Sequence, residues 1–218
     1  MFKAVIFDMD GVIVDSEPLH IKAERRTLAP FGLDISDEEF HAYMGQTPRI
    51  LLNGMIKKYN LNTSIDDLYA VHIQNLLSLY RDEVEPIPGA LDLISQLKEY
   101  GVSLALASSS DMNLIKVVME KFGLTETFKE VTSGQELERV KPFPDIFLKT
   151  SERLHIPPKE CVVIEDSTSG IRAAKAAGMT CIGFRSPNSK NQNYSDADVI
   201  VDDLRSVDME FFETLCEK

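Results

Sequence analysis

The stretch VIFDMDG, residues 5–11, places three apolar residues before two aspartates, Asp8 and Asp10, and ends on a glycine. The apolar run resembles a short buried strand, so both carboxylates come where that strand ends. Asp and Gly are common turn residues, and a solvated turn is the simplest interpretation of this motif alone. The alternative is a reaction centre, in which one carboxylate is a nucleophile and the other a general acid and base, beside a hard cation.

Similar apolar runs recur along the chain and alternate with amphipathic helical stretches. This alternation is typical of an α/β, Rossmann-like parallel sheet with helices on both faces, and ligands of such sheets bind beyond the carboxyl ends of the strands. The polar segment 185–198 is predicted to be a surface loop. The predicted strands are 3–7, 102–107, 128–133 (the weakest), 161–165, 179–184 and 197–201, and the predicted helices among them are 89–101, 112–123, 144–155 and 169–178.

One region breaks the alternation, because helical spacing replaces strands between about residues 15 and 85. Pro88 and Gly89 then give turn and helix-start signals. We therefore predict an α/β core domain of residues 1–14 and 87–218, with a helical domain of residues 15–86 inserted after the first strand. The helical stretches of the insertion are 20–32, 36–45, 48–60 and 64–84.

Acidic residues dominate the 218-residue chain, with a net charge of -12 and a pI near 4.8. Nucleic acids and anionic membrane surfaces select for clustered Lys and Arg, so we expect neither as a partner. No apolar run approaches the roughly 18 residues of a membrane span, and the N-terminus lacks the pattern of a signal peptide. Cys161, Cys181 and Cys216 are odd in number and lack metal-ligand spacing, which favours reduced core residues and a cytoplasmic location. We expect a monomer.

Polar residues also follow the second predicted strand, in the run SSSD at 108–111. Ser108 and Ser109 stand at a strand-to-helix junction, where hydroxyl and backbone N–H groups form a site for phosphate oxygens. For Ser110 and Asp111, capping of the following helix is the favoured interpretation. We therefore predict Ser108 and Ser109 as phosphate-binding residues.

Lys141 and the pair Glu165–Asp166 complete the candidate set. Lys141 precedes Pro142 in a stiff loop, from which a fixed ammonium could neutralise phosphate charge. Glu165 and Asp166 end an apolar strand, and capping alone, worth about 0.3–1 kcal/mol, explains such a pair poorly. With the two N-terminal aspartates they form a self-repelling set of four carboxylates, whose all-oxygen chemistry indicates Mg²⁺.

The chain contains, in order, D-x-D-G-V at 8–12, Ser108 after a strand, K-P at 141 and E-D-S at 165–167. Together these segments resemble the four motifs of the haloacid dehalogenase superfamily. Two longer segments, FDMDGVIVDSEPLH and KPFPDIF, are similar to those of its capped sugar-phosphate phosphatases and β-phosphoglucomutases. This resemblance implies that residues 1–14 and 87–218 form the catalytic core domain and that residues 15–86 form the helical cap domain. The resemblance implies Asp8 as nucleophile, Asp10 as general acid and base, and phosphoryl contacts from Ser108 and Lys141. It also implies Mg²⁺ bound by Asp8, the Asp10 carbonyl, Glu165 and Asp166.

Cap residues near the hinge are expected to choose the leaving group of a small phosphorylated metabolite. His20 resembles a cap histidine of the β-phosphoglucomutases, and Arg49 could bind a second phosphate. His72 stands where those mutases carry a further lysine, which favours a sugar-phosphate phosphatase over the alternative, a β-phosphoglucomutase. A non-catalytic metabolite-binding module is the alternative of another class. The cap candidates are Asp15, Glu17, His20, Gly45, Gln46 and Arg49, of which we predict His20, Gln46 and Arg49 to bind substrate.

Overall fold

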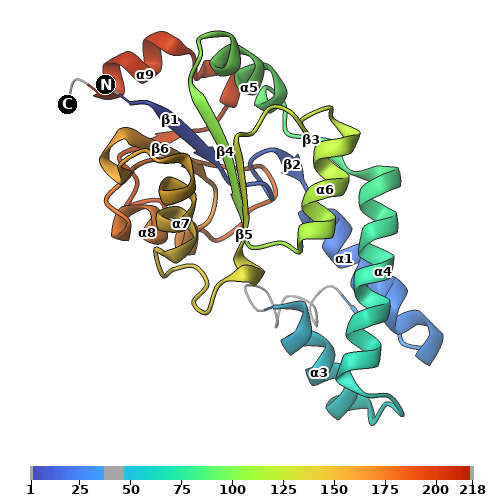
Figure 1. Ribbon diagram of the computed structural model, residues 1–218. Coiled ribbons are helices and arrows are strands. Elements are labelled where there is room, and N and C mark those ends of the chain that lie inside the picture. The colour runs from blue at the N-terminus through green and yellow to red at the C-terminus, as the bar shows by residue number, and fades with distance from the viewer. Residues whose placement is uncertain (1, 37–46, 217–218) are drawn as a thin grey trace. The chain divides into compact units, whose positions relative to one another are not determined.

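The computed structural model describes residues 2–36 and 47–216. It divides into two compact units, one made of Met1–Asp15 with Glu85–Lys218 and the other of Ser16–Val84 (Figure 1). The predicted domain limits lie one residue before the first of these boundaries and two residues after the second. None of the helices in the described residues is long and apolar enough to cross a membrane.

The larger unit is built on a six-stranded parallel sheet in the order β5-β4-β1-β6-β7-β8. Its central strand is β1, where Phe7 pairs with Leu106 on one side and with Ile164 on the other. The fold class predicted from the sequence is confirmed, and each predicted strand is present. The strands are β1 Ala4–Phe7, β4 Ser103–Ser108, β5 Glu130–Ser133, β6 Cys161–Glu165, β7 Thr180–Phe184 and β8 Val199–Val201.

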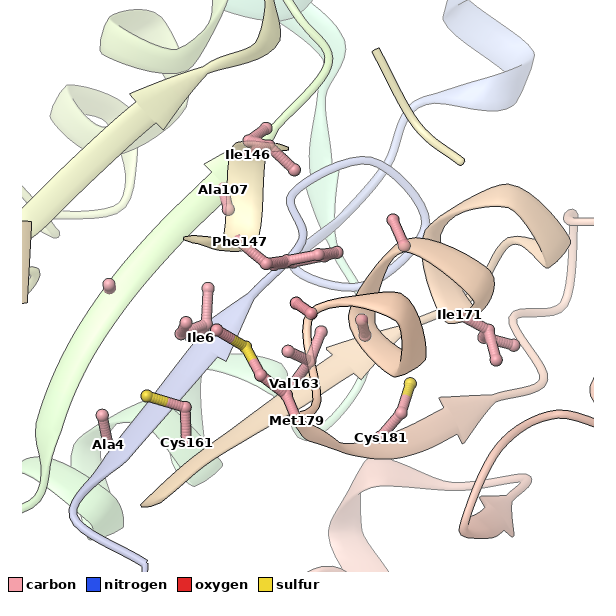
Figure 2. Close-up of a cluster of buried hydrophobic side chains, with 14 residues drawn as sticks. Ala4, Ile6, Ala107, Ile146, Phe147, Cys161, Val163, Ile171, Met179 and Cys181 are labelled. Atoms are coloured by element: carbon pink, nitrogen blue, oxygen red, sulfur yellow. The ribbon is translucent and has the colours of Figure 1, made fainter. Parts of the chain in front are cut away.

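Helices pack on this sheet, with α7 against β4 and β5, α8 against β6 and β7, and α5 against β4 (Figure 1). Figure 2 shows the core under α7 and α8, where Ala4 and Ile6 of β1 meet Val163 of β6 and Phe147 of α7. Alternate residues of each strand enter this cluster, as the two-residue period of a strand requires. The helices are α5 Ala90–Glu99, α6 Met112–Lys121, α7 Asp145–Leu154, α8 Thr168–Ala176 and α9 Met209–Cys216, of which α9 was not predicted.

Cys161 and Cys181 are buried and free, as predicted for reduced residues of the core. The expectation of a simple surface loop at 185–198 is wrong in part. Ser186 is 7% exposed, and Ser189 donates a hydrogen bond to the buried Asp166. Polar composition alone therefore failed to show that this loop turns inward.

A short antiparallel ribbon, β2 Val14–Asp15 with β3 Glu85–Pro86, joins the larger unit to the insertion. The backbone N–H of Ile87 donates to the carbonyl of Ile13 at 2.9 Å and extends this contact. Gly89 then adopts a φ of 86° just before α5, as its predicted turn position favours.

The smaller unit, Ser16–Val84, contains α1 Glu17–Leu28, α3 Pro48–Tyr59 and α4 Ile65–Glu83. Ser64 caps α4 by accepting from the N–H of Asp67. Most of the predicted helix at 36–45 lies outside the described residues. The core of this unit consists of Leu28, Ile35, Leu51, Leu52, Met55 and Leu68. Short 3₁₀ turns complete the chain at Ala29–Phe31, Gly134–Glu136, Pro158–Glu160 and Leu204–Ser206.

Candidate active site

Asp8, Lys141 and Glu165 form a buried ion cluster at the carboxyl ends of the central strands. Asp8 directly follows β1, and its backbone N–H donates to Ile164 of β6 at 3.1 Å. Lys141 Nζ lies 2.5 Å from Asp8 Oδ1 and 2.7 Å from Glu165 Oε1. It also donates to the carbonyl of Ala107 at the end of β4, at 3.3 Å. Asp8 and Glu165 come together because β1 and β6 are neighbours in the sheet, and Lys141 reaches both from the loop that precedes α7.

Burial and charge act in opposite directions on this cluster. Burial raises the pKa of Asp8 to about 8, with Glu165 and Asp10 adding to the rise and Lys141 opposing it. For Lys141, burial alone would lower the pKa, but the charges of Asp8 and Glu165 outweigh it and raise the pKa above its usual value. Lys141 is therefore a permanent cation beside a carboxylate that needs further positive charge to stay ionised.

Asp10 lies among the hydroxyl groups that follow β4. Ser110 Oγ donates to Asp10 Oδ2 at 2.6 Å, and Ser108 Oγ lies 3.3 Å from the same oxygen. Ser109 is exposed. Asp111 is the residue that caps α6, by accepting from the N–H of Asn113 at 2.8 Å. Ser110 was thus considered only as a cap, and its contact with Asp10 was missed.

Glu165 is fixed by hydrogen bonds at both of its carboxylate oxygens. Its Oε2 accepts from the backbone N–H of Ser167 at 2.8 Å and from the Ser167 hydroxyl at 2.9 Å. Its Oε1 accepts from Lys141. A Cβ atom at Gly170, in the first turn of α8, would overlap this carboxylate. The absence of a side chain at Gly170 therefore leaves the room in which Glu165 holds Lys141.

Gly170→Ala is expected to destabilise the protein by about 1–3 kcal/mol, because the added methyl group displaces Glu165 from its hydrogen bonds. Helix propensity alone would predict the opposite sign, a gain of about 1 kcal/mol. Urea unfolding of Gly170→Ala in the parent and in a Glu165→Ala background separates the two effects. In the second background the same change should stabilise, and equal effects in both backgrounds would contradict the assigned contact.

Asp166, 6% exposed, lies where two loops meet. Ser189 Oγ donates to its Oδ2. Gly11 has a φ of 79°, and a Cβ there would overlap the Asp166 carboxylate. Burial, followed by the charges of Glu165 and Asp8, raises the pKa of Asp166 well above its usual range, while Ser189 and Lys141 oppose the rise.

The predicted gathering of four carboxylates around one metal ion is not found, because no group of three or more His, Cys, Asp or Glu side chains suited to a metal ion occurs in residues 2–36 and 47–216. Mg²⁺ does not need such a group, because it commonly takes one or two carboxylates together with waters and substrate phosphate oxygens. Asp8, Asp166 and the backbone carbonyl of Asp10 could supply such a set. Glu165, also predicted as a ligand, has both oxygens engaged by Lys141 and Ser167.

Two of the predicted cap residues, His20 and Arg49, make contacts within the smaller unit. His20 Nε2 lies 3.3 Å from the hydroxyl of Tyr80. Arg49 pairs with Asp66 and stands over the ring of Tyr69 at 5.2 Å. Of the remaining candidates, Glu17 is exposed, Asp15 accepts from Asn188 at 2.6 Å within the larger unit, and Gly45 and Gln46 lie outside the described residues.

His72 is fully buried in the smaller unit, and neither of its ring nitrogens has a hydrogen-bond partner among the described residues. Its ring stacks on Tyr69, with centroids 6.1 Å apart. Burial, with a smaller contribution from His20, lowers the pKa of His72 to about 4. The imidazole is therefore neutral near pH 7.

His72→Leu is expected to remove a loss of stability at acid pH. The folded pKa of about 4 lies below the ordinary value of 6.5, so the unfolded chain binds the proton more tightly and the free energy of unfolding falls between pH 6.5 and 4. The shift corresponds to about 3 kcal/mol. Glu24, whose pKa is raised to about 7 by burial and by Glu17, acts in the opposite direction in parent and variant alike.

Urea unfolding at pH 7.5 and pH 4.5 measures this effect as the difference between variant and parent. The advantage of His72→Leu should grow as the pH falls. An advantage that is the same at both pH values would show that His72 does not resist protonation.

Comparison with known proteins assigns the chain to a family. The family model of haloacid dehalogenase-like hydrolases matches residues 5–184. The chain therefore belongs to the haloacid dehalogenase-like hydrolase family, as its motifs predicted.

Several curated relatives carry phosphatase names. The chain is 32% identical to hexitol phosphatase B of Escherichia coli K12 over 86% of each protein. It is 31% identical to the fructose-1-phosphate phosphatase YqaB of the same strain, over 84% of this chain and 97% of that protein. Two longer relatives of Arabidopsis thaliana also match at 32% identity, and the chain spans 18% and 54% of their lengths.

Solved structures with a similar fold cover nearly the whole chain. CbbY from Rhodobacter sphaeroides in complex with phosphate superposes with a TM-score of 0.86 at 27% identity, covering 98% of this chain and all of that one. A putative β-phosphoglucomutase from Thermotoga maritima superposes with a TM-score of 0.82 at 28% identity, over 99% of both chains.

Proposed function

We propose that this protein is a Mg²⁺-dependent phosphatase that hydrolyses a small phosphorylated sugar through an aspartyl phosphate on Asp8. The observation that carries the proposal is the position of Lys141, whose ammonium contacts both Asp8 and Glu165 at the ends of β1 and β6. A buried cation beside a buried carboxylate lowers the repulsion between that carboxylate and a phosphate dianion.

In the first half-reaction, an Asp8 oxygen attacks the phosphorus in line, and the bond from phosphorus to the sugar oxygen breaks. Asp10 gives its proton to the departing sugar oxygen. The hydroxyl groups of Ser108 and Ser110 orient the Asp10 carboxyl group for this transfer.

In the second half-reaction, Asp10 takes a proton from water, and the resulting hydroxide attacks the aspartyl phosphate. Phosphate leaves and Asp8 is restored as a carboxylate. Lys141 and Ser108 stabilise the charge on the phosphoryl oxygens in both steps. When bound by Asp8, Asp166 and the Asp10 carbonyl, Mg²⁺ would neutralise charge on both phosphate and carboxylates.

A sugar phosphate is the proposed substrate because hexitol phosphatase B and the fructose-1-phosphate phosphatase each match this chain over most of their length, 86% and 97%. We propose that the unit Ser16–Val84 acts as the cap that selects the leaving group, with His20, Gln46 and Arg49 as contacts. The reduced Cys161 and Cys181 support the proposed cytoplasmic location. A monomer is proposed from the sequence alone.

The phosphatase is favoured over the mutase by two cap residues. A β-phosphoglucomutase must hold a second phosphate of a bisphosphate intermediate, and that task needs positive charge. His72 is neutral because burial lowers its pKa, and Arg49 is already paired with Asp66. The mutase stays as the second candidate because of the likeness to the putative Thermotoga enzyme.

A panel of phosphorylated sugars, scored by phosphate release with Mg²⁺ and with EDTA, tests the proposal. We expect Mg²⁺-dependent release from at least one hexose or hexitol phosphate and from a generic aryl phosphate. An assay with β-glucose 1-phosphate, with and without the 1,6-bisphosphate, distinguishes the mutase from the phosphatase. The mutase would form glucose 6-phosphate without releasing free phosphate. A chain that binds sugar phosphates and turns over none of them would be a non-catalytic binding module.

A further inference from the structure

The loop that follows β7 is held by hydrogen bonds on both sides of the proposed metal ligand Asp166. Asn188 Nδ2 donates to Asp15 Oδ2 at 2.6 Å. Gln192 Oε1 accepts from both the backbone N–H and the hydroxyl of Thr168, each at 2.9 Å. The N–H of Asn193 donates to the Thr168 hydroxyl at 2.7 Å. The loop is thus anchored to the start of α8 on one side and to the end of β2 on the other.

Ser189 lies between these anchors, and its hydroxyl donates to Asp166 Oδ2. The ideal Cβ position at Gly11 is 3.0 Å from the same hydroxyl oxygen. The Asp166 carboxylate is therefore enclosed by the backbone of Gly11 and the side chain of Ser189. Fixing one carboxylate oxygen also fixes the rotation of the group, so the direction of Oδ1 is set as well.

We propose that Ser189 is a positioning residue, which holds the Asp166 carboxylate in the orientation that binds Mg²⁺. The proposal rests on the proposed Mg²⁺-dependent function and adds a residue outside the four motifs. Partners that orient a metal ligand commonly contribute 10–100-fold to metal affinity, because an unheld ligand must be ordered when the ion binds. Ser189 does not touch the reacting atoms, so its effect should appear first in ion binding.

Ser186 offers a matched control in the same loop. Ser186 is buried, whereas Ser189 is half-buried, and the Ser186 hydroxyl has no partner among the described residues. Each of the two variants, Ser186→Ala and Ser189→Ala, removes one hydroxyl oxygen. Only the oxygen that is lost in Ser189→Ala contacts Asp166.

The experiment measures Mg²⁺ binding by calorimetry in the absence of substrate, for the parent chain, Ser189→Ala, Ser186→Ala and Ser189→Thr. We expect Ser189→Ala to weaken Mg²⁺ binding by about tenfold or more, Ser186→Ala to bind as the parent does, and Ser189→Thr, which keeps the hydroxyl, to recover most of the loss. The Mg²⁺ concentration that gives half-maximal aryl phosphate turnover should shift by a similar factor. Thermal unfolding in EDTA checks that all four chains are folded.

Ser189→Ala binding Mg²⁺ as tightly as the parent would overturn the proposal, and so would an equal loss in Ser186→Ala. A parent chain that turns over aryl phosphate with Mg²⁺ while Ser189→Ala is unchanged would reject the role of Ser189 alone. A parent chain without Mg²⁺ binding or turnover would reject the proposed function itself, and this inference with it.

Discussion

Asp8→Asn is expected to lower the turnover of nitrophenyl phosphate by about 10⁴-fold or more, the scale seen when a covalent nucleophile is removed. The amide has nearly the same shape as the carboxylate, but it cannot form the aspartyl phosphate. The variant should stay folded, because Lys141 keeps its contact with Glu165 at 2.7 Å and one member of a crowded set of acids is neutralised. Phosphate release under saturating Mg²⁺ measures the effect.

Asp92→Asn is the matched control, since Asp92 is an exposed acid in the first turn of α5. It should retain parental turnover. Turnover by Asp8→Asn within tenfold of the parent would exclude covalent catalysis at this residue and move the reaction to a directly attacking water.

Lys141→Met is expected to destabilise the protein by about 3–5 kcal/mol, because it leaves Asp8 and Glu165 buried without a positive partner. The Lys141 side chain is 6% exposed, and those of its two partners are 8% and 1% exposed, so water cannot replace the lost ammonium. Turnover should fall about 10²–10³-fold as well, since phosphoryl charge loses a fixed donor. Urea unfolding and aryl phosphate turnover measure the two effects.

The loss of stability in Lys141→Met should be larger at high pH than at low pH. Without Lys141, the folded-state pKa of Asp8 rises further above its unfolded value, so the penalty is larger at pH 8 than at pH 5, where the carboxyl groups take up protons. Lys149→Met is the control, because Lys149 pairs with the largely exposed Glu152 and its removal should have no measurable effect. Equal stabilities of Lys141→Met and the parent at pH 8 would contradict the buried triad.

Part of this site could be predicted from the sequence because its residues stand at the ends of the strands. Asp8, Ser108 and Glu165 each stand at the carboxyl end of an apolar run, and parallel neighbours bring such ends together. Lys141 was predicted from its motif and from the prolines beside it, and its ammonium does reach Asp8. The ordered motifs therefore carried enough information to predict the centre of the site.

Ser110 and Ser189 could not be predicted in the same way. A serine in a loop has no periodicity, and its partner depends on the tertiary path of the chain. Ser110 was assigned to the helix cap that Asp111 provides. Ser189 stands in a polar segment whose composition is that of an exposed loop, and its contact with Asp166 spans 23 residues.

The position of β1 in the middle of the sheet affects the order in which the chain folds during translation. β1 precedes β4 and β6 in the chain, yet it can be buried only once the ribosome has added both strands. The helices α1, α3 and α4 all precede β4 in the chain and can begin to pair as they emerge. We therefore expect the inserted unit to fold before the sheet closes, and because contacts between distant segments form slowly, the proposed nucleophile Asp8 should reach its place late. On this account the nascent chain should gain activity only after β6, which supplies Glu165, has been synthesised.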